Sequence, residues 1–150
     1  LEDNKMKNKT IFLWTITSAL LLGLSGCKTL DERAMEAKFT NPEGVTLMTE
    51  AALRETLVGN TYAGDSVKYD GSYIEFIQPD GKISGLWNGT DRYKGEWAIS
   101  GNVWCYKYKS SNGCNTLSKS GDTIYWYQLD GSSMGGKATV TKGDSKGLAK

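Results

Sequence analysis

The chain has 150 residues and a nearly balanced charge, with 18 lysine and arginine residues against 17 aspartate and glutamate residues. A chain of this length forms one domain, and a balanced charge gives no electrostatic footprint for a nucleic-acid partner. The absence of histidine removes Ser-His and Cys-His nucleophilic sites and the commonest metal ligand. We therefore expect no cofactor, no metal site and no nucleic acid.

The segment before Cys27 is organised like an export signal. Residues 1–5 precede the first methionine, and we expect them to be an upstream remnant outside the fold. Residues 6–26 begin with lysines and continue as an apolar run, Thr10–Leu24. This run has about 15 residues, short of the roughly 20 that a membrane-spanning helix needs. It ends in Leu-Ser-Gly-Cys, which resembles the lipobox of bacterial lipoproteins. A plain membrane anchor is the alternative interpretation.

The lipobox resemblance implies that the mature protein begins at Cys27, with acyl chains that hold it to the membrane. The next residue is Lys28 rather than the aspartate that resembles an inner-membrane retention signal. The resemblance therefore implies an outer-membrane lipoprotein that faces the periplasm, anchored stably by multiple chains. We expect residues 27–48 to be a lipidated, solvated tether, residues 49–144 the folded domain and residues 145–150 a flexible tail.

The folded domain begins with a helix signal and continues with strand signals. Thr49 can cap a short helix over Glu50–Val58, and Gly59 suits the position after its end. Beyond it, about eight short segments with alternating side chains are separated by tight turns. The predicted strands are 60–64, 72–78, 82–87, 93–99, 103–108, 114–118, 123–129 and 137–142. This spacing predicts an all-β fold, an antiparallel meander curled into a small barrel (lipocalin-like or sandwich-like) with one short N-terminal helix.

Alternation along each strand predicts which side chains fill the barrel. The pattern places Trp104, Tyr106 and Tyr108 on the inward face. In two other strands it places Glu75 and Trp126 on the outward face. The predicted core is rich in aromatic side chains, so two interpretations stay open. Aromatic rings fill a solid barrel in the first, and some of them line an open mouth in the second.

Cys105 and Cys114 fall on the outward face of neighbouring strands. Facing residues of an antiparallel pair lie close enough for a disulfide, and a periplasmic location favours oxidation. Metal binding and redox catalysis are the alternatives, but the pair lacks Cys-x-x-Cys spacing and further ligands. We expect a structural disulfide.

No catalytic motif emerges, so we expect a non-enzymatic protein. The default interpretation of the carboxylates Glu75, Asp91, Glu96 and Asp122 is solvated surface charge rather than a catalytic pair. The first expectation is binding of a small apolar or glycan ligand, or of an envelope component. The candidate ligand residues are Trp87, Trp104, Tyr106 and Tyr108. The alternative is a solid barrel that acts as an interaction or structural module, an inhibitor or accessory subunit. Its candidate contact residues are Tyr73, Leu86 and Trp126. An enzyme that acts on cell-wall glycans is the remote alternative.

Several short motifs follow one another between Leu57 and Asp144. They are a Gly-x-Thr-aromatic opening, a Pro-Asp-Gly-Lys turn that leads to Trp87, a Gly-x-Trp strand, two cysteines and a closing Gly-Asp. In this order the sequence resembles the proteobacterial family catalogued as domain of unknown function 995, small secreted or lipid-anchored proteins. Tyr62 stands where a tryptophan is usual in that family. The resemblance implies an envelope location and brings no activity.

The basic start, the short apolar run and the Leu-Ser-Gly-Cys motif together predict acylation of Cys27. The substitution Cys27→Ala is expected to abolish metabolic labelling with radioactive palmitate and to leave the precursor uncleaved or the protein unanchored. Labelling that persists in the variant would show that Cys27 is not the acylated residue.

Overall fold

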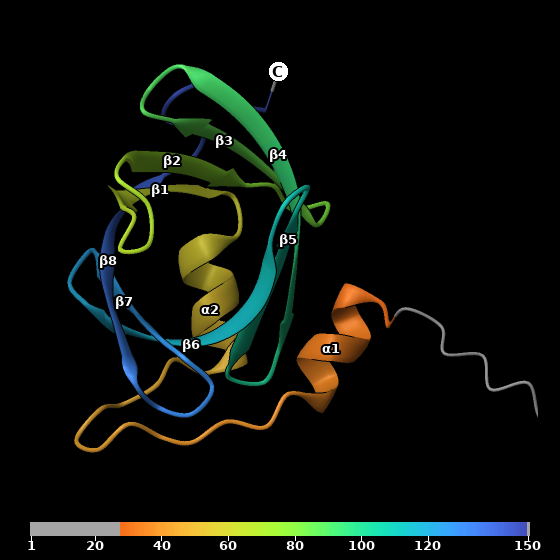
Figure 1. Cartoon of the computed structure of the whole chain (residues 1–150), viewed down its shortest axis with the longest axis vertical. Helices are drawn as coiled ribbons and strands as arrows, with labels where there is room; N and C mark the ends of the chain where they lie inside the picture. The colour runs from red at the N-terminus through yellow and green to blue at the C-terminus, as the bar shows by residue number, and fades with distance from the viewer. Residues whose placement is uncertain (1–27, 150) are drawn as a thin grey trace, which may run out of the picture.

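Alternating side chains and tight turns curl the chain into a closed barrel, seen in Figure 1. The computed structural model describes residues 28–149, so Cys27 lies outside the described residues. The strands are β1 (Asn60–Asp65), β2 (Ser72–Ile77), β3 (Lys82–Trp87), β4 (Asp91–Ser100), β5 (Val103–Tyr108), β6 (Asn112–Ser120), β7 (Thr123–Tyr127) and β8 (Ser133–Lys142). Each strand pairs antiparallel with the next, and β8 pairs with β1. The predicted antiparallel meander and barrel are confirmed.

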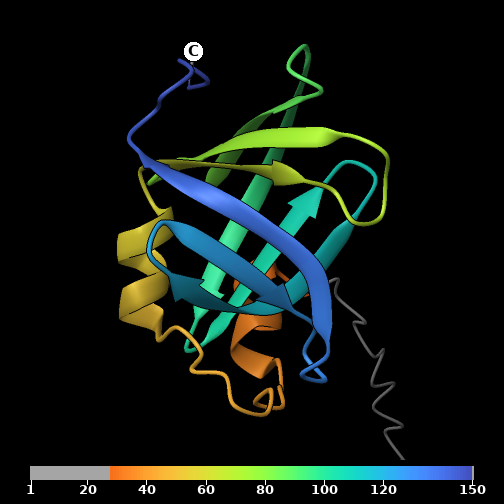
Figure 2. The ribbon, with the colours of Figure 1, turned by 90° about the vertical axis from the view of Figure 1, so that its left-hand side faces the viewer.

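Helix α2 (Glu50–Leu57) closes one end of the barrel. The Thr49 side chain caps the helix by accepting a hydrogen bond from the Ala52 amide, as the sequence predicts. Leu53 and Leu57 are fully buried in the barrel core, and the Arg54 guanidinium donates to the Ile99 carbonyl at 3.0 Å. Figure 2 shows α2 at one end of the barrel, with the loop between β1 and β2 at the opposite end.

Helix α1 (Leu30–Glu36) packs on the outside of the barrel. Its Ala34 is buried against Ala98 of β4 and Val103 of β5. The expectation of a solvated tether over residues 28–48 is therefore wrong for this segment. The reason is that α1 docks through only two apolar side chains, Ala34 and the partly buried Leu30, which are too weak a signal to show in periodicity. Neither helix among residues 28–149 is long and apolar enough to span a bilayer.

The C-terminal segment is also ordered against the barrel. Leu148 is buried, and the Asp144 carboxylate accepts hydrogen bonds from the Leu148 and Ala149 amides at 2.7 and 2.9 Å. The Thr61 hydroxyl donates to the Gly143 carbonyl at 2.7 Å and accepts from the Ser145 amide. The prediction of a flexible tail is wrong for residues 145–149, because local hydrogen bonds and one leucine fix a segment that its composition suggests is loose.

Two strands face the opposite way from the prediction. In β2, Glu75 lies inside the barrel and Phe76 outside, whereas alternation had placed Phe76 in the core. Phe76 is nevertheless buried, and its cross-strand partner Thr61 is hydrogen-bonded to Gly143 and Ser145 of the C-terminal segment. In β7, Trp126 belongs to the core and is 9% exposed. Tyr125 and Tyr127 flank it, so all three positions are aromatic and the pattern gives no sign of the face.

Cys105 and Cys114 are cross-strand partners of β5 and β6 and form a disulfide, as predicted. Their Cα atoms are 4.0 Å apart, on the outer surface. Cys105 is fully buried in the same apolar patch as Ala34, so the disulfide lies beside α1. The disulfide therefore closes the loop between β5 and β6, and it forms part of the apolar patch on which α1 packs.

Replacement of both cysteines by serine is expected to lower the free energy of unfolding by about 2.5–3 kcal/mol, the loop-closure term for about ten residues. Equilibrium urea denaturation of the oxidised protein and the double variant measures the difference. A change of less than about 0.5 kcal/mol, or two free thiols in unreduced protein, would contradict the prediction.

Candidate functional site

The interior of the barrel has two layers of different chemistry. The layer next to α2 is apolar and consists of fully buried side chains: Ile77, Ile83, Leu117 and Ile124, together with Trp104. Trp97 stacks on Trp104 with ring centroids 5.6 Å apart and donates its indole N–H to the Gln78 carbonyl. The layer towards the opposite end is built mainly from tyrosines. We call this second part the tyrosine end, formed by the half-buried side chains Tyr73, Trp87, Tyr93, Tyr106 and Tyr108.

Each of the four tyrosines at the tyrosine end faces a glycine on the neighbouring strand. The cross-strand pairs are Gly64 with Tyr73, Gly85 with Tyr93, Gly95 with Tyr108 and Gly113 with Tyr106. A Cβ atom placed on any of the four glycines would lie within 3.0 Å of the partner's side chain. The glycines therefore leave the space that the tyrosine rings occupy, and a methyl group there would displace the rings.

Glu75 lies among these rings and is 4% exposed. Its Oε1 accepts hydrogen bonds from the hydroxyls of Tyr93 at 2.6 Å and Tyr108 at 2.7 Å. Its Oε2 accepts a hydrogen bond from the hydroxyl of Tyr62. The three donors come from β1, β4 and β5, so the carboxylate joins strands from across the barrel.

Burial raises the pKa of the Glu75 carboxyl above its usual range, and the hydrogen bonds from the three tyrosine hydroxyls oppose that rise. Burial, followed by the charge of Glu75, raises the pKa of Tyr62 and Tyr108 well above the usual value for tyrosine. The same two causes raise the pKa of Tyr93 and Tyr73. The hydroxyls therefore stay protonated at neutral pH and remain donors to the carboxylate.

The loop over residues 66–71 lies at the tyrosine end, between β1 and β2. Its Tyr69 is 56% exposed and makes an edge-to-face contact with Trp87, with ring centroids 6.5 Å apart. Gly71 leaves the room for Trp87, since a Cβ there would lie 2.5 Å from the indole ring. The loop therefore extends the aromatic surface of the tyrosine end beyond the strands.

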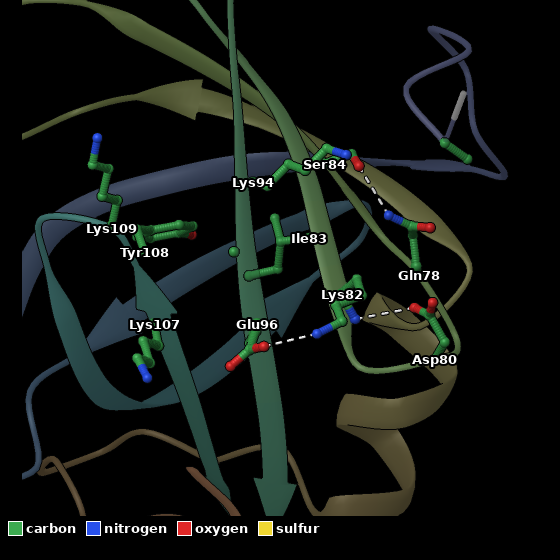
Figure 3. Close-up of a pocket in the computed structure, with 12 residues that line it drawn as sticks. Gln78, Asp80, Lys82, Ile83, Ser84, Lys94, Glu96, Lys107, Tyr108 and Lys109 are labelled. Carbon is green, nitrogen blue, oxygen red and sulfur yellow. Dashed lines mark hydrogen bonds and ion pairs between the residues drawn. The ribbon is translucent and has the colours of Figure 1, made fainter. Parts of the chain in front are cut away.

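A hollow of about 580 Å³ lies over β3, β4 and β5 (Figure 3), and Tyr108 of the tyrosine end is one of the residues that line it. Lys82 and Glu96 form an ion pair of 2.7 Å across it. Lys94, Lys107 and Lys109 also line the hollow and form no salt bridge among residues 28–149. Apart from Tyr108 and Ile83, most of the side chains that line this hollow are charged or polar.

The structure brings together three of the four predicted ligand residues. Trp87, Tyr106 and Tyr108 belong to the tyrosine end, whereas Trp104 is 1% exposed in the apolar layer. Trp104 therefore cannot touch a ligand without unfolding of that layer.

Of the predicted contact residues, Leu86 lies on the outer surface. Tyr73 and Trp126 belong to the interior, which contradicts their predicted outward position. The residue that the sequence prediction missed is Glu75, expected as surface charge. Glu75 lies opposite Tyr62 on the neighbouring strand, and Tyr62 belongs to the core. Pairing the two strands in this register would have placed Glu75 on the inner face.

The candidate carboxylates do not form a pair. Glu75 is inside the barrel and Glu96 is outside in its ion pair with Lys82. Asp122 lies beside α2, in a second outer hollow of about 530 Å³. Within residues 28–149 no three acidic or cysteine side chains are gathered as metal ligands would be.

No family model matches the chain, and neither the curated proteins nor the solved structures contain a significant match.

The buried carboxyl predicts a specific dependence of stability on pH. Because the pKa of Glu75 is raised on folding, the folded protein binds this proton more tightly than the unfolded chain does. The stabilisation that this proton gives to the folded protein is fully present below the unfolded pKa of about 4.3. It is lost as the pH rises through the higher folded pKa. Glu75→Gln lacks this titration. The free energy of unfolding of the wild type minus that of the variant is therefore expected to fall as the pH rises above the unfolded pKa of about 4.3 and through the higher folded pKa. A pH-independent difference in urea denaturation would contradict the assignment.

Proposed function

We propose that this chain is a non-enzymatic binding domain of the bacterial envelope that takes a small ligand at the tyrosine end of its barrel. Acyl chains on Cys27 anchor it, in the outer membrane and facing the periplasm. The lipobox-like motif supports the location, and so does the resemblance to the family catalogued as domain of unknown function 995.

The observation that carries this proposal is the unequal chemistry of the two ends. The end next to α2 is closed by buried leucine and isoleucine side chains. At the tyrosine end the five aromatic side chains are half-buried, so part of each still meets solvent. Aromatic surface with a few polar groups between is typical of sites for small apolar molecules and sugars.

The non-enzymatic part of the proposal rests on the carboxylates. Glu75 is the one buried carboxylate among residues 28–149, and general acid–base catalysis of glycan cleavage requires two. The two oxygens of Glu75 already accept three hydrogen bonds. Both oxygens of Glu75 are therefore already occupied by hydroxyls of the protein itself.

A second candidate function, an interaction module, is favoured by the outer hollow in Figure 3. Three lysines without salt bridges line one face of the barrel there, and such a face would suit an acidic envelope partner. Leu86 is the remaining predicted contact residue on the outer surface, since Tyr73 and Trp126 lie inside.

The test uses Tyr106→Ala, with Tyr125→Ala as the matched control. Tyr106 belongs to the tyrosine end, and Tyr125 is an exposed tyrosine on the outer surface. Soluble peptidoglycan fragments and the neutral apolar dye N-phenyl-1-naphthylamine serve as probes, and binding is followed by tryptophan and dye fluorescence. We expect Tyr106→Ala to weaken binding about tenfold, about 1.4 kcal/mol, and Tyr125→Ala to leave it unchanged. Equal binding by Tyr106→Ala and the wild type, or no binding of either probe, would contradict the proposal.

A further inference from the structure

When it is ionised, Glu75 has no counter-ion in the described part of the chain. The three salt bridges among residues 28–149 join Lys28 with Glu36, Arg54 with Glu50, and Lys82 with Glu96. All six of these side chains are about half exposed, on the outer surface. Glu75 is instead balanced only by neutral tyrosine hydroxyls. A carboxylate in a medium of low polarity creates a strong negative potential around it, and that potential reaches the half-buried rings of the tyrosine end.

The hydrogen bonds to Glu75 also change the rings themselves. A tyrosine hydroxyl that donates to a carboxylate gains electron density on its oxygen, and the ring gains part of it. Tyr93 and Tyr108 both donate to the same oxygen of Glu75, and both rings remain half-buried. Their faces are therefore more negative than those of an isolated tyrosine, which strengthens their attraction for a cation.

The rings of the tyrosine end form an aromatic cluster. The planes of Tyr93 and Tyr108 are 82° apart with centroids separated by 5.7 Å. Tyr106 lies 5.3 Å from Tyr108 at 36°, and Tyr69 stands edge to face with Trp87 at the rim. These rings contact one another directly, so a cation would bind against the faces that the aromatic cluster leaves uncovered rather than between Tyr93 and Tyr108.

The chain already places one of its own cations at this end. The Lys68 ammonium lies over the Tyr69 ring, 5.1 Å from its centroid. Tyr69 is the main cause, with a smaller contribution from Tyr106, of a raised pKa for Lys68. Lys68 is carried by the loop over residues 66–71, so a ligand cation would compete with it for the same negative surface.

Resting on the proposed function, we infer that the ligand of the tyrosine end is a small organic cation, an amine or a quaternary ammonium compound. An anion would be repelled by Glu75, and a neutral sugar would stack on the rings without gaining from the buried charge. A cation gains from both, because the ring faces contact it directly and Glu75 attracts it from behind the hydroxyls.

Choline and its neutral isostere 3,3-dimethyl-1-butanol test this inference on the wild-type protein by isothermal titration calorimetry, at a pH above the range in which Glu75 titrates in the urea experiment, where its carboxyl is ionised. The two compounds share their shape and differ in charge, so their affinity ratio measures the electrostatic part of binding alone. We expect choline to bind at least tenfold more tightly, about 1.4 kcal/mol. Equal affinities would overturn the cation inference and leave the proposed function standing, because the tyrosine end would still bind a small ligand. If neither compound bound, the cation inference would fail, and the glycan and dye probes above would decide the proposed function separately.

Two variants are expected to change the affinity for choline in opposite directions. Glu75→Gln removes the charge, and we expect it to reduce the choline preference to about twofold or less. Lys68→Gln removes the competing cation from an exposed position, and we expect choline affinity to increase about two- to fivefold. Lys146→Gln is the matched control, because Lys146 is an exposed lysine in the C-terminal segment at the α2 end. An equal gain in Lys68→Gln and Lys146→Gln would reflect net charge alone and contradict the inference. If Glu75→Gln failed to fold, the Lys68 comparison and the wild-type affinity ratio would still decide it.

Discussion

The hydrogen bonds between Glu75 and three tyrosine hydroxyls constrain how the strands can be arranged at the tyrosine end of the barrel. A carboxylate that is 4% exposed is costly unless donors surround it. The donor Tyr62 comes from β1, which pairs with the strand of Glu75, and the donors Tyr93 and Tyr108 come from the neighbouring strands β4 and β5, beyond β3. The three strands must therefore close around one point. A shift of any of them by one residue would turn its tyrosine outward and leave the carboxylate without a donor.

The cross-strand glycines make this arrangement possible. A small barrel has room for few large side chains, and the tyrosine end holds five. Gly85 and Gly95 lie under the rings of Tyr93 and Tyr108, with too little space for a methyl group. Glycine weakens a strand because it has no side chain to pack, and the ring on the neighbouring strand restores that contact. The glycines that alternation places inside the barrel are therefore spacers for tyrosines, and they differ in purpose from the turn glycines such as Gly101.

How much could be predicted from the sequence depended on how distinct each signal was. The strands, the capped helix α2 and the cysteine pair followed from local patterns, because alternation, a capping threonine and cross-strand spacing each act over a few residues. The face of β2 could not be predicted, since its alternation placed a charge against apolar side chains and the charge lies inside. What reverses the rule is a set of donors from strands 13 to 33 residues away. The face of β7 failed differently, because three consecutive aromatic residues carry no alternation. The docking of α1 rests on Ala34 and Leu30, too few apolar side chains to give a clear pattern.

The tyrosine end is hard to explain by stability. Replacing buried charged or polar groups by apolar side chains of similar volume is often neutral or stabilising, and the layer next to α2 shows that this chain can build such a core. The protein would therefore be at least as stable with apolar side chains in place of the four tyrosines and the carboxylate at the other end. Proteins commonly give up stability in this way where a binding site must be polar, have a defined shape and be partly open. The same end carries the half-buried rings and the loop with Tyr69 and Lys68. For this reason we place binding at the tyrosine end rather than on the outer lysine surface. The lysines around the outer hollow lie on the surface and replace no core packing. Contact with solvent alone accounts for them, without a ligand.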